Sequence, residues 1–192
     1  MKQVLIINGH PDKQSFNYAL SEAYIKGVKK TNSTISQINI SELDFNPNLM
    51  FGYRKRMKLE PDLVDAIDKI KKADPIVWVF PMWWYGYTAL MKGFIDRTFL
   101  PGITFQPIEG KALPEKLLKG KSGRLIITAD TPRWYDFLMM KSPTINQFKN
   151  GTLKFCGISP VKTTYISSIK NSSSNFREKW FKKISLLGES LA

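Results

Sequence analysis

Five apolar stretches along the chain predict the strands of one β-sheet. They lie at residues 2–8, 34–40, 76–80, 123–129 and 161–167. The stretch 76–80 (IVWVF) is apolar at every position, which suits a strand buried on both faces of a parallel sheet. The stretch 34–40 (TISQINI) alternates apolar and polar residues, which is the period of a β-strand.

Helical periodicity fills the gaps between these strands, with apolar residues recurring three and four positions apart. The helical segments are residues 16–30, 60–73, 90–99, 144–155 and 176–187. This alternation predicts one domain over residues 1–192, of the α/β class, with a doubly wound, five-stranded parallel sheet and helices on both faces. In such a sheet the turns after the strands meet at the carboxyl edge, where ligands bind.

The turn after the first stretch is polar and leads directly into a helix. Residues 9–15 read GHPDKQS. A strand, a polar loop and a helix make a phosphate site, because first-turn N–H groups are unpaired and carry the positive dipole end. Ser15 and Asn17 offer a hydroxyl and an amide at the helix entrance; the other interpretation of Ser15 is a plain N-cap. The loop is neither GxGxxG nor a P-loop, which disfavours a Rossmann dinucleotide site and a nucleoside triphosphatase.

The turn after the third stretch is aromatic. Pro81 ends the strand, and Trp83, Trp84 and Tyr85 follow before Gly86. Large flat rings at a ligand-binding edge indicate a surface for a planar ligand. The alternative is that the two tryptophans pack in the core.

Two long segments lack regular periodicity. Residues 41–58 carry aromatic and basic side chains, including Phe51, Tyr53 and Arg54. We expect a partial lid or a dimer contact there, with an ordinary exposed loop as the alternative. Residues 101–121 are rich in glycine and proline, and loops of this length in compact domains usually carry function or an interface.

Two of these segments resemble the NAD(P)H:quinone oxidoreductase family, which includes DT-diaphorase, the modulators of drug activity and the ancillary subunits of potassium-efflux systems. They are NGHPDKQSFNYAL at residues 8–20 and PMWWYGYTALMKGFIDRTF at residues 81–99. The resemblance implies a flavodoxin-like fold, in which the first segment holds the flavin phosphates and the second lies against the isoalloxazine. The implied cofactor contacts are His10, Gln14, Ser15, Phe16, Asn17, Pro81, Met82, Trp83, Trp84 and Tyr85.

The turn after the fourth stretch departs from the pattern of many relatives. They carry T-T-G-G there, with a tyrosine downstream that touches flavin and substrate. This chain has T-A-D-T at residues 128–131, and the predicted turn runs from Asp130 to Tyr135. The resemblance implies Thr128 and Asp130 as cofactor contacts and Tyr135 as the catalytic residue. The other interpretation of Tyr135 is a packed core or interface aromatic.

Some relatives pair that tyrosine with a histidine, but His10 is the only histidine of this sequence. Tyr135 therefore acts alone, or with Arg133 or Lys141, or the backbone supplies the electrostatics. These alternatives stay open on the sequence alone.

The implied function is a flavin-dependent NAD(P)H oxidoreductase that passes hydride from NAD(P)H through the bound flavin to a quinone or a similar electrophile. FMN is the expected cofactor, with FAD as the alternative, and NAD(P)H is the co-substrate. A homodimer is the expected form. The alternatives are a regulatory subunit of a transporter, with that transporter as partner and reductase activity secondary, and an electron-shuttling flavodoxin, although flavodoxins are typically acidic.

The charge raises a further alternative. Lysine and arginine number 29 against 16 acids, which gives a net charge of +13 and invites a nucleic-acid-binding function. The cations are dispersed along helical faces, and no helix-turn-helix, zinc-finger or RNA-recognition pattern accompanies them. We therefore expect no specific nucleic-acid partner and a largely solvated basic surface.

The single cysteine, Cys156, lies in an apolar stretch and is expected to be a buried thiol in a reducing compartment. One histidine and one cysteine offer no spacing for a metal site, so none is expected. The chain begins MKQVLII, which lacks the features of a secretory signal, and no apolar run approaches a membrane span of ~20 residues. A cytoplasmic protein is expected.

Overall fold

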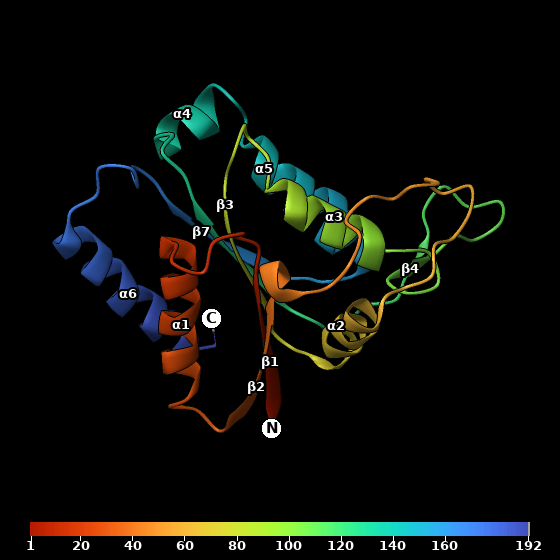
Figure 1. Cartoon of the computed structure of the whole chain (residues 1–192), viewed down its shortest axis with the longest axis horizontal. Coiled ribbons are helices and arrows are strands. Elements are labelled where there is room, and N and C mark those ends of the chain that lie inside the picture. The colour runs from red at the N-terminus through yellow and green to blue at the C-terminus, as the bar shows by residue number, and fades with distance from the viewer. Residues whose placement is uncertain (192) are drawn as a thin grey trace.

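The computed structural model of the protein describes residues 1–191. Its centre is a parallel sheet with the strand order β2-β1-β3-β6-β7 (Figure 1). The strands are β1 (Lys2–Asn8), β2 (Ser33–Asn39), β3 (Ile76–Pro81), β6 (Gly123–Thr128) and β7 (Val161–Ile166). Each predicted strand is confirmed to within one residue at either end, and the strand order is that of a flavodoxin-like sheet.

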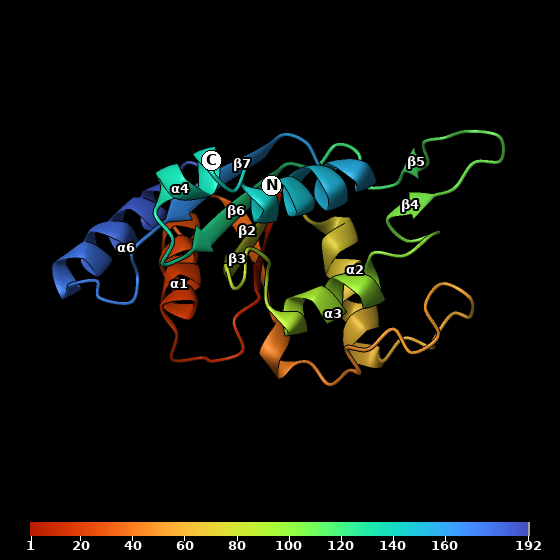
Figure 2. The same ribbon diagram turned by 90° about the horizontal axis from the view of Figure 1, so that it is seen from above.

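Helices cover both faces of this sheet, as predicted. They are α1 (Phe16–Val28), α2 (Pro61–Lys72), α3 (Ala89–Thr98), α4 (Arg133–Leu138), α5 (Pro143–Ile145), the π-helical segment η2 (Asn146–Lys154) and α6 (Ser174–Glu189). One hydrophobic cluster joins α2, α3, α5 and η2 to one face, and a second joins α1 and α6 to the other. Figure 2 shows α1 and α6 side by side, with α2 and α3 across the sheet. Every residue of β3 is buried, as its sequence predicts.

Helices α1 and α6 pack unusually closely because each contributes a glycine to the contact. A Cβ on Gly27 would overlap the backbone at Ser185, and a Cβ on Gly188 would overlap the backbone at Tyr24. This close approach fixes the last helix against the first. It therefore sets the position of residues at the start of α6 relative to the loop that precedes α1.

Three segments differ from the sequence prediction. The predicted turn that ends at Tyr135 is in fact the start of α4, because Pro132 takes the N-cap position and its carbonyl accepts the first helical hydrogen bond from Asp136 N–H. The predicted helix over 144–155 is π-helical along most of its length. The loop 101–121 contains a short antiparallel pair, β4 (Phe105–Gln106) and β5 (Glu115–Lys116).

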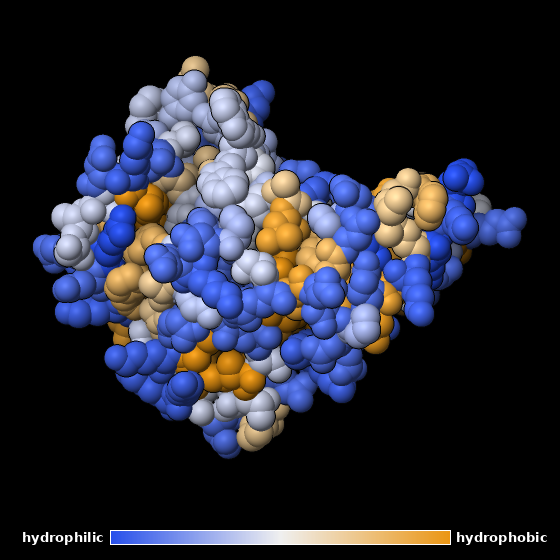
Figure 3. Space-filling model, viewed as in Figure 1, coloured by the Kyte–Doolittle hydropathy of each residue, from blue (hydrophilic) through white to orange (hydrophobic). Residues whose placement is uncertain are grey.

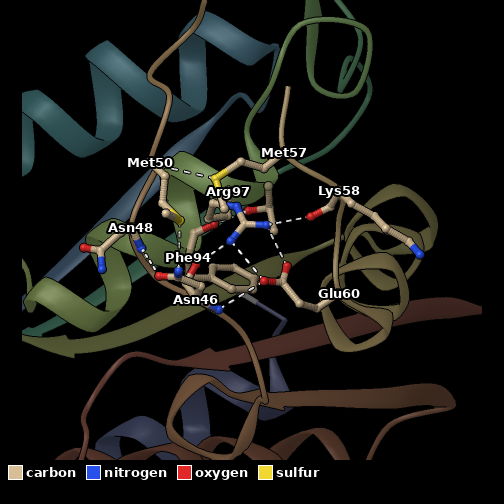
Figure 4. A network of polar contacts seen from close by, with 9 residues as sticks. Asn46, Asn48, Met50, Met57, Lys58, Glu60, Phe94 and Arg97 are labelled. Atoms are coloured by element: carbon tan, nitrogen blue, oxygen red, sulfur yellow. Dashed lines mark hydrogen bonds and ion pairs between the residues drawn. The ribbon is translucent and has the colours of Figure 1, made fainter. Parts of the chain in front are cut away.

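A long excursion between β2 and α2, residues 43–59, is tied down by one buried arginine (Figure 4). Arg97 on α3 is 1% exposed. Its guanidinium donates to the Lys58 carbonyl (3.0 Å), to the Glu60 carboxylate (2.6 Å) and to the Asn46 carbonyl. Because Asn46 and Lys58 lie near opposite ends of the excursion, one side chain fixes both ends.

The thiol of Cys156 is buried, as expected, and this burial raises its pKa. Within residues 1–191, no helix is both long and apolar enough to cross a membrane.

Candidate active site

A pocket of about 300 Å³ opens at the carboxyl edge of the sheet. The turns after β1, β3, β6 and β7 all contribute to it, so the polar turn and the aromatic turn do meet on one edge. Its lining consists of His10, Asp12, Ser15, Phe16, Asn17, Pro81, Met82, Trp83, Thr128, Ala129, Asp130, Ile169 and Arg177. Most of the predicted contacts are in this lining. Gln14, Trp84, Tyr85 and Tyr135 are outside it.

The polar turn is held open by its own hydrogen bonds. The Ser15 hydroxyl oxygen accepts from Tyr18 N–H at 3.2 Å and caps α1, so the N-cap interpretation is confirmed. Because the oxygen is the acceptor in this bond, the hydroxyl hydrogen is left to donate into the pocket. The Thr88 hydroxyl donates to the Gly9 carbonyl at 2.7 Å and ties the turn to the start of α3. The first turn of α1 contributes Phe16 and Asn17 to the pocket lining.

Asn17 has a buried amide donor that lacks a partner. The side chain is 3% exposed, and its Oδ1 accepts a hydrogen bond from the Thr128 hydroxyl at 2.9 Å. Its Nδ2 makes no hydrogen bond within the described part of the chain. An unsatisfied buried donor costs on the order of 1–3 kcal/mol. A ligand that supplies an acceptor oxygen would remove that cost.

The environment of His10 favours a neutral imidazole that donates through one ring nitrogen. Its Nδ1 accepts from Asp12 N–H at 3.0 Å, which places the ring hydrogen of the neutral form on Nε2. Burial lowers the pKa of His10 and outweighs the neighbouring Asp12, which raises it. The imidazole meets the Trp83 ring edge to face, with centroids 5.7 Å apart, and so bridges the two turns.

Arg177 brings a guanidinium to the pocket, and sequence reasoning missed it. It lies on α6, where its Nε donates to the Ser172 hydroxyl at 2.9 Å and its guanidinium carbon sits 5.4 Å from the centre of the Phe16 ring. The sequence offered no signal, because Arg177 is one of many cations near the C-terminus and only the close α1–α6 packing brings it to this edge. Ile169, in the segment between β7 and α6, was also missed.

The two carboxylates in the lining are engaged by backbone donors. Asp12 Oδ1 accepts from Gln14 N–H at 2.9 Å, and Asp130 Oδ1 accepts from Lys170 N–H at 2.6 Å. Gln14 therefore shapes the polar turn through its backbone. Each carboxylate thus accepts a charge-assisted hydrogen bond from the backbone.

The aromatic turn is a tight hairpin with unusual backbone dihedral angles at its tip. Trp83 and Gly86 exchange two N–H to carbonyl hydrogen bonds, each of 2.9 Å. Trp84 and Tyr85, the two residues at the tip of this hairpin, have φ angles of +49° and +55°. This left-handed conformation is uncommon for bulky residues, and it occurs most often at functional sites. Trp84 is 100% exposed and Trp83 48% exposed. The core-packing alternative is therefore wrong for Trp84 and at most partial for Trp83.

Helix α4 begins three residues after the pocket residue Asp130 and carries Tyr135, which is outside the pocket lining. Tyr135 is 37% exposed and contacts Trp134, with ring centroids 5.7 Å apart. Asp136, one position further on, is buried and accepts from Arg133 and from the Ser142 hydroxyl. Arg133 is therefore engaged by Asp136 rather than by Tyr135. In Figure 3 pale and tan atoms cover the tip of the molecule over α4, where Trp134, Phe137, Leu138 and Met139 are exposed.

The arrangement suits an elongated ligand with an anionic end and a flat end. The donors on one side are the Asn17 amide, the His10 Nε2–H, the Ser15 hydroxyl, the Arg177 guanidinium and the α1 N-terminus, which together form an oxyanion or phosphate site. The other side is built from Trp83, Met82 and Pro81 and suits an aromatic ring. Within residues 1–191, no three His, Cys, Asp or Glu side chains form a group that could hold a metal ion.

The chain matches the family described as having the flavodoxin-like fold over residues 2–184. It is 23% identical to NAD(P)H dehydrogenase [quinone] 1 of Rattus norvegicus over 221 residues, covering 98% of this chain and 78% of that one. Among solved structures, Smu.1420 from Streptococcus mutans is 31% identical with a TM-score of 0.82, covering 98% and 99% of the two chains.

An FMN-dependent NADH-azoreductase from Bacillus anthracis, solved with FMN, has a TM-score of 0.76 at 18% identity over the full length of both chains. At that identity the likeness concerns the fold. The family match covers nearly the whole chain, and a quinone dehydrogenase is among the relatives. The protein thus belongs to the family with the flavodoxin-like fold that also contains the NAD(P)H:quinone oxidoreductases.

Proposed function

We propose that the pocket binds FMN and that the protein is a flavin-dependent NAD(P)H oxidoreductase that reduces a quinone or a similar electrophile. The main support for this proposal is the buried, unpartnered amide of Asn17. It lies among hydrogen-bond donors that suit a phosphate, in a pocket that also contains Trp83 of the aromatic hairpin. A phosphate oxygen would satisfy the Asn17 donor, and the Trp83 face would receive the ring.

The phosphate end is assigned to five groups. They are the α1 N-terminus and the side chains of Ser15, Asn17, His10 and Arg177, which would all donate to the phosphate. Neutral His10 donates through Nε2, and Arg177 contributes the positive charge that a phosphate dianion requires. Charge-assisted bonds of this kind each contribute on the order of 1.5–3 kcal/mol.

The ring end is assigned to the aromatic hairpin and to the turn after β6. The N–H groups of Trp83 and Gly86 are used within the hairpin, so those of Trp84 and Tyr85 are left to face the ring edge. When bound, the flavin supplies hydride acceptance from the nicotinamide and hydride donation to the acceptor. The N–H groups of Trp84 and Tyr85 would stabilise negative charge at that edge of the bound ring.

Tyr135 is assigned to the acceptor side of the pocket, on the exposed α4. Because Arg133 is held by Asp136 and Ser142, Tyr135 acts without Arg133. The apolar side chains exposed on α4 suit a hydrophobic acceptor such as a quinone.

FMN is favoured over FAD because the donors that would meet a phosphate are gathered at one end of the pocket. We also propose a cytoplasmic homodimer. A groove of about 400 Å³ between α3, η2 and the β4–β5 arm is lined by Phe99, Phe105 and Phe155, and a second copy would cover these rings.

The test begins with the cofactor. Protein refolded or purified with excess flavin is washed and heat-denatured, and the released compound is identified by its mass. FMN is the expected product, and NADPH should bleach the yellow protein until a quinone restores the colour. A protein that takes up no flavin under these conditions would refute the proposal.

The variant Asn17→Ala tests whether the Asn17 amide binds the flavin. Asn150→Ala is the control, because Asn150 is an exposed amide outside the pocket. We expect FMN affinity to fall about ten- to a hundredfold in the first variant only.

A further inference from the structure

A second pocket lies at the amino edge of the sheet, where the strands begin. In Figure 1 this edge is at the bottom, and α4 marks the opposite edge at the top. Gly123 begins β6 and Pro160 directly precedes β7. The pocket has a volume of about 190 Å³ and is lined by Tyr24, Pro75, Ser122, Gly123, Arg124, Pro160, Lys162 and Leu191. We call it the amino-edge pocket.

The hydroxyl of Tyr24 is a buried polar group that lacks a partner. Tyr24 lies on α1 and is 0% exposed, and its hydroxyl makes no hydrogen bond within the described part of the chain. Burial raises the pKa of Tyr24 to about 12, so the hydroxyl keeps its proton at neutral pH. A buried donor without an acceptor is costly, and a ligand oxygen in the amino-edge pocket would remove that cost.

Two cations line the same pocket from neighbouring strands. Arg124 on β6 and Lys162 on β7 are partners in the parallel register of the sheet. Both belong to the face that α1 and α6 cover, because Ile126 and Ile166, two and four positions further on, pack in the hydrophobic cluster of those helices. The cations are thus on the same side of the sheet as Tyr24.

Arg124 adds a buried positive charge beside the phenol. It is 6% exposed, and its guanidinium donates to the Thr164 hydroxyl at 2.8 Å. Burial lowers the pKa of Arg124, while its electrostatic interaction with Tyr24 raises it. This interaction shows that the phenol and the guanidinium lie close together. A charge held away from bulk water acts strongly on an ion beside it.

Among the residues that the structure describes, none of those in the lining is acidic. Asp74 adjoins the pocket through Ser122, whose N–H and hydroxyl each donate to Asp74 Oδ1 at 2.8 Å. Asp74 also interacts electrostatically with Lys121, whose pKa it raises against the larger, lowering effect of burial. This acid is therefore engaged outside the lining, and the amino-edge pocket favours negative charge.

We propose that the amino-edge pocket binds a small anion through a carboxylate or phosphoryl oxygen. The Tyr24 hydroxyl donates to that oxygen, the Lys162 ammonium forms a charge-assisted hydrogen bond with the anion, and Arg124 contributes positive potential. The volume of about 190 Å³ equals that of roughly six water molecules in the liquid, which is room for an ion of the size of phosphate or acetate.

The anion would connect α1, β6, β7 and the segment that follows α6. Tyr24 is also the residue whose backbone lies against Gly188 in the close contact between α1 and α6. Because a ligand that binds only the folded state stabilises it, occupancy of the pocket should raise the unfolding temperature.

The experiment is thermal unfolding of the purified full-length protein at fixed pH and ionic strength, with sodium phosphate or sodium acetate replacing sodium chloride. We expect the unfolding temperature to rise and to saturate with at least one of the two ions. A response to phosphate alone identifies a phosphoryl ligand, and a response to acetate alone identifies a carboxylate. No saturable response to either ion would overturn the proposal.

Tyr24→Phe decides whether the response comes from this pocket, because phosphate also stabilises proteins by exclusion from their surface. The variant keeps the ring and removes the unpartnered hydroxyl. In chloride it should unfold at the same temperature as the wild type or higher, whereas in the stabilising ion the order should reverse, since affinity falls about ten- to a hundredfold. Tyr18→Phe, the same change elsewhere on α1, should shift the unfolding temperature equally in all three salts.

Two results with Tyr24→Phe would contradict the proposal. A variant that is less stable than the wild type in chloride as well would show that the hydroxyl has a structural role within the protein. A variant that stays more stable in every salt would show that no anion uses the hydroxyl.

Two further variants test the charge and the location. Lys162→Gln should weaken the ion response about two- to fivefold, whereas Lys179→Gln, at an exposed position of α6, should not; equal weakening would show an effect of net charge and would overturn the proposal. Asn17→Ala, in the candidate active site, should respond to the ions like the wild type. If Asn17→Ala abolishes the response and Tyr24→Phe does not, the anion binds at the other edge of the sheet and the proposal is wrong. No flavin or nicotinamide is added, so the outcome is independent of the proposed reductase function.

Discussion

Thr128, the last residue of β6, donates a hydrogen bond of 2.9 Å to the side-chain oxygen of Asn17 in the first turn of α1. The two residues are 111 positions apart, yet this bond determines which way the Asn17 amide faces. With Oδ1 occupied, the unpartnered Nδ2 is the polar atom of Asn17 that is left for a ligand in the pocket. The orientation of the proposed phosphate donor on the first helix therefore depends on the fourth strand of the main sheet.

This relationship predicts the behaviour of Thr128→Val. Loss of the hydroxyl leaves Asn17 Oδ1 without its donor, so FMN affinity should fall about two- to tenfold, the usual range for one neutral hydrogen bond. Thr128→Ser retains the donor and should restore affinity. Fluorescence quenching of FMN measures both, and equal affinity in the valine variant and the wild type would disprove the orienting role.

Arg177→Gln should discriminate between phosphorylated and unphosphorylated flavin. Because the guanidinium is assigned to the phosphate, FMN affinity should fall about ten- to a hundredfold while riboflavin affinity stays unchanged. Lys179→Gln is the matched control on the same helix. A parallel loss for both flavins would instead place Arg177 against the ring or in a purely structural role.

The depressed pKa of His10 predicts a pH dependence of the flavin-free protein. Burial favours neutral imidazole in the folded state, so the unfolded chain takes up a proton at a higher pH than the folded one does. Stability is therefore greatest above the ordinary value of 6.5 and declines as the pH falls through that value toward the lower pKa of the folded state.

Thermal unfolding across this range measures the effect. His10→Gln, which is neutral throughout, should flatten the slope near 6.5. A slope there that is identical in the variant would assign it to other groups.

The variant Trp84→Ala should weaken flavin binding without changing the stability of the folded protein. The side chain is 100% exposed, and alanine keeps the strained left-handed backbone, so the unfolding temperature should not change. Loss of an aromatic contact should weaken flavin binding about two- to tenfold. Tyr53→Ala, another exposed aromatic, is the control. An unchanged FMN affinity in Trp84→Ala would remove Trp84 from the site.

The sheet could be predicted from the sequence because its strands are nearly uniform apolar runs such as IVWVF, whose burial requirement dominates local preference. Helix α4 could not, because the proline before it, Pro132, is as common in a turn as at the start of a helix. Most of the pocket lining followed from two local segments. Arg177 and the orientation of Asn17 did not, because both depend on contacts between distant parts of the chain that local spacing does not encode.

The clamp that Arg97 forms on both ends of the excursion separates this segment mechanically from the sheet. Insertions, deletions or exchanges between residues 47 and 57 would be absorbed on the outer side of the clamp, without strain reaching β2, α2 or the pocket. The length and sequence of the excursion are thus expected to be variable without any effect on the chemistry of the sheet edge.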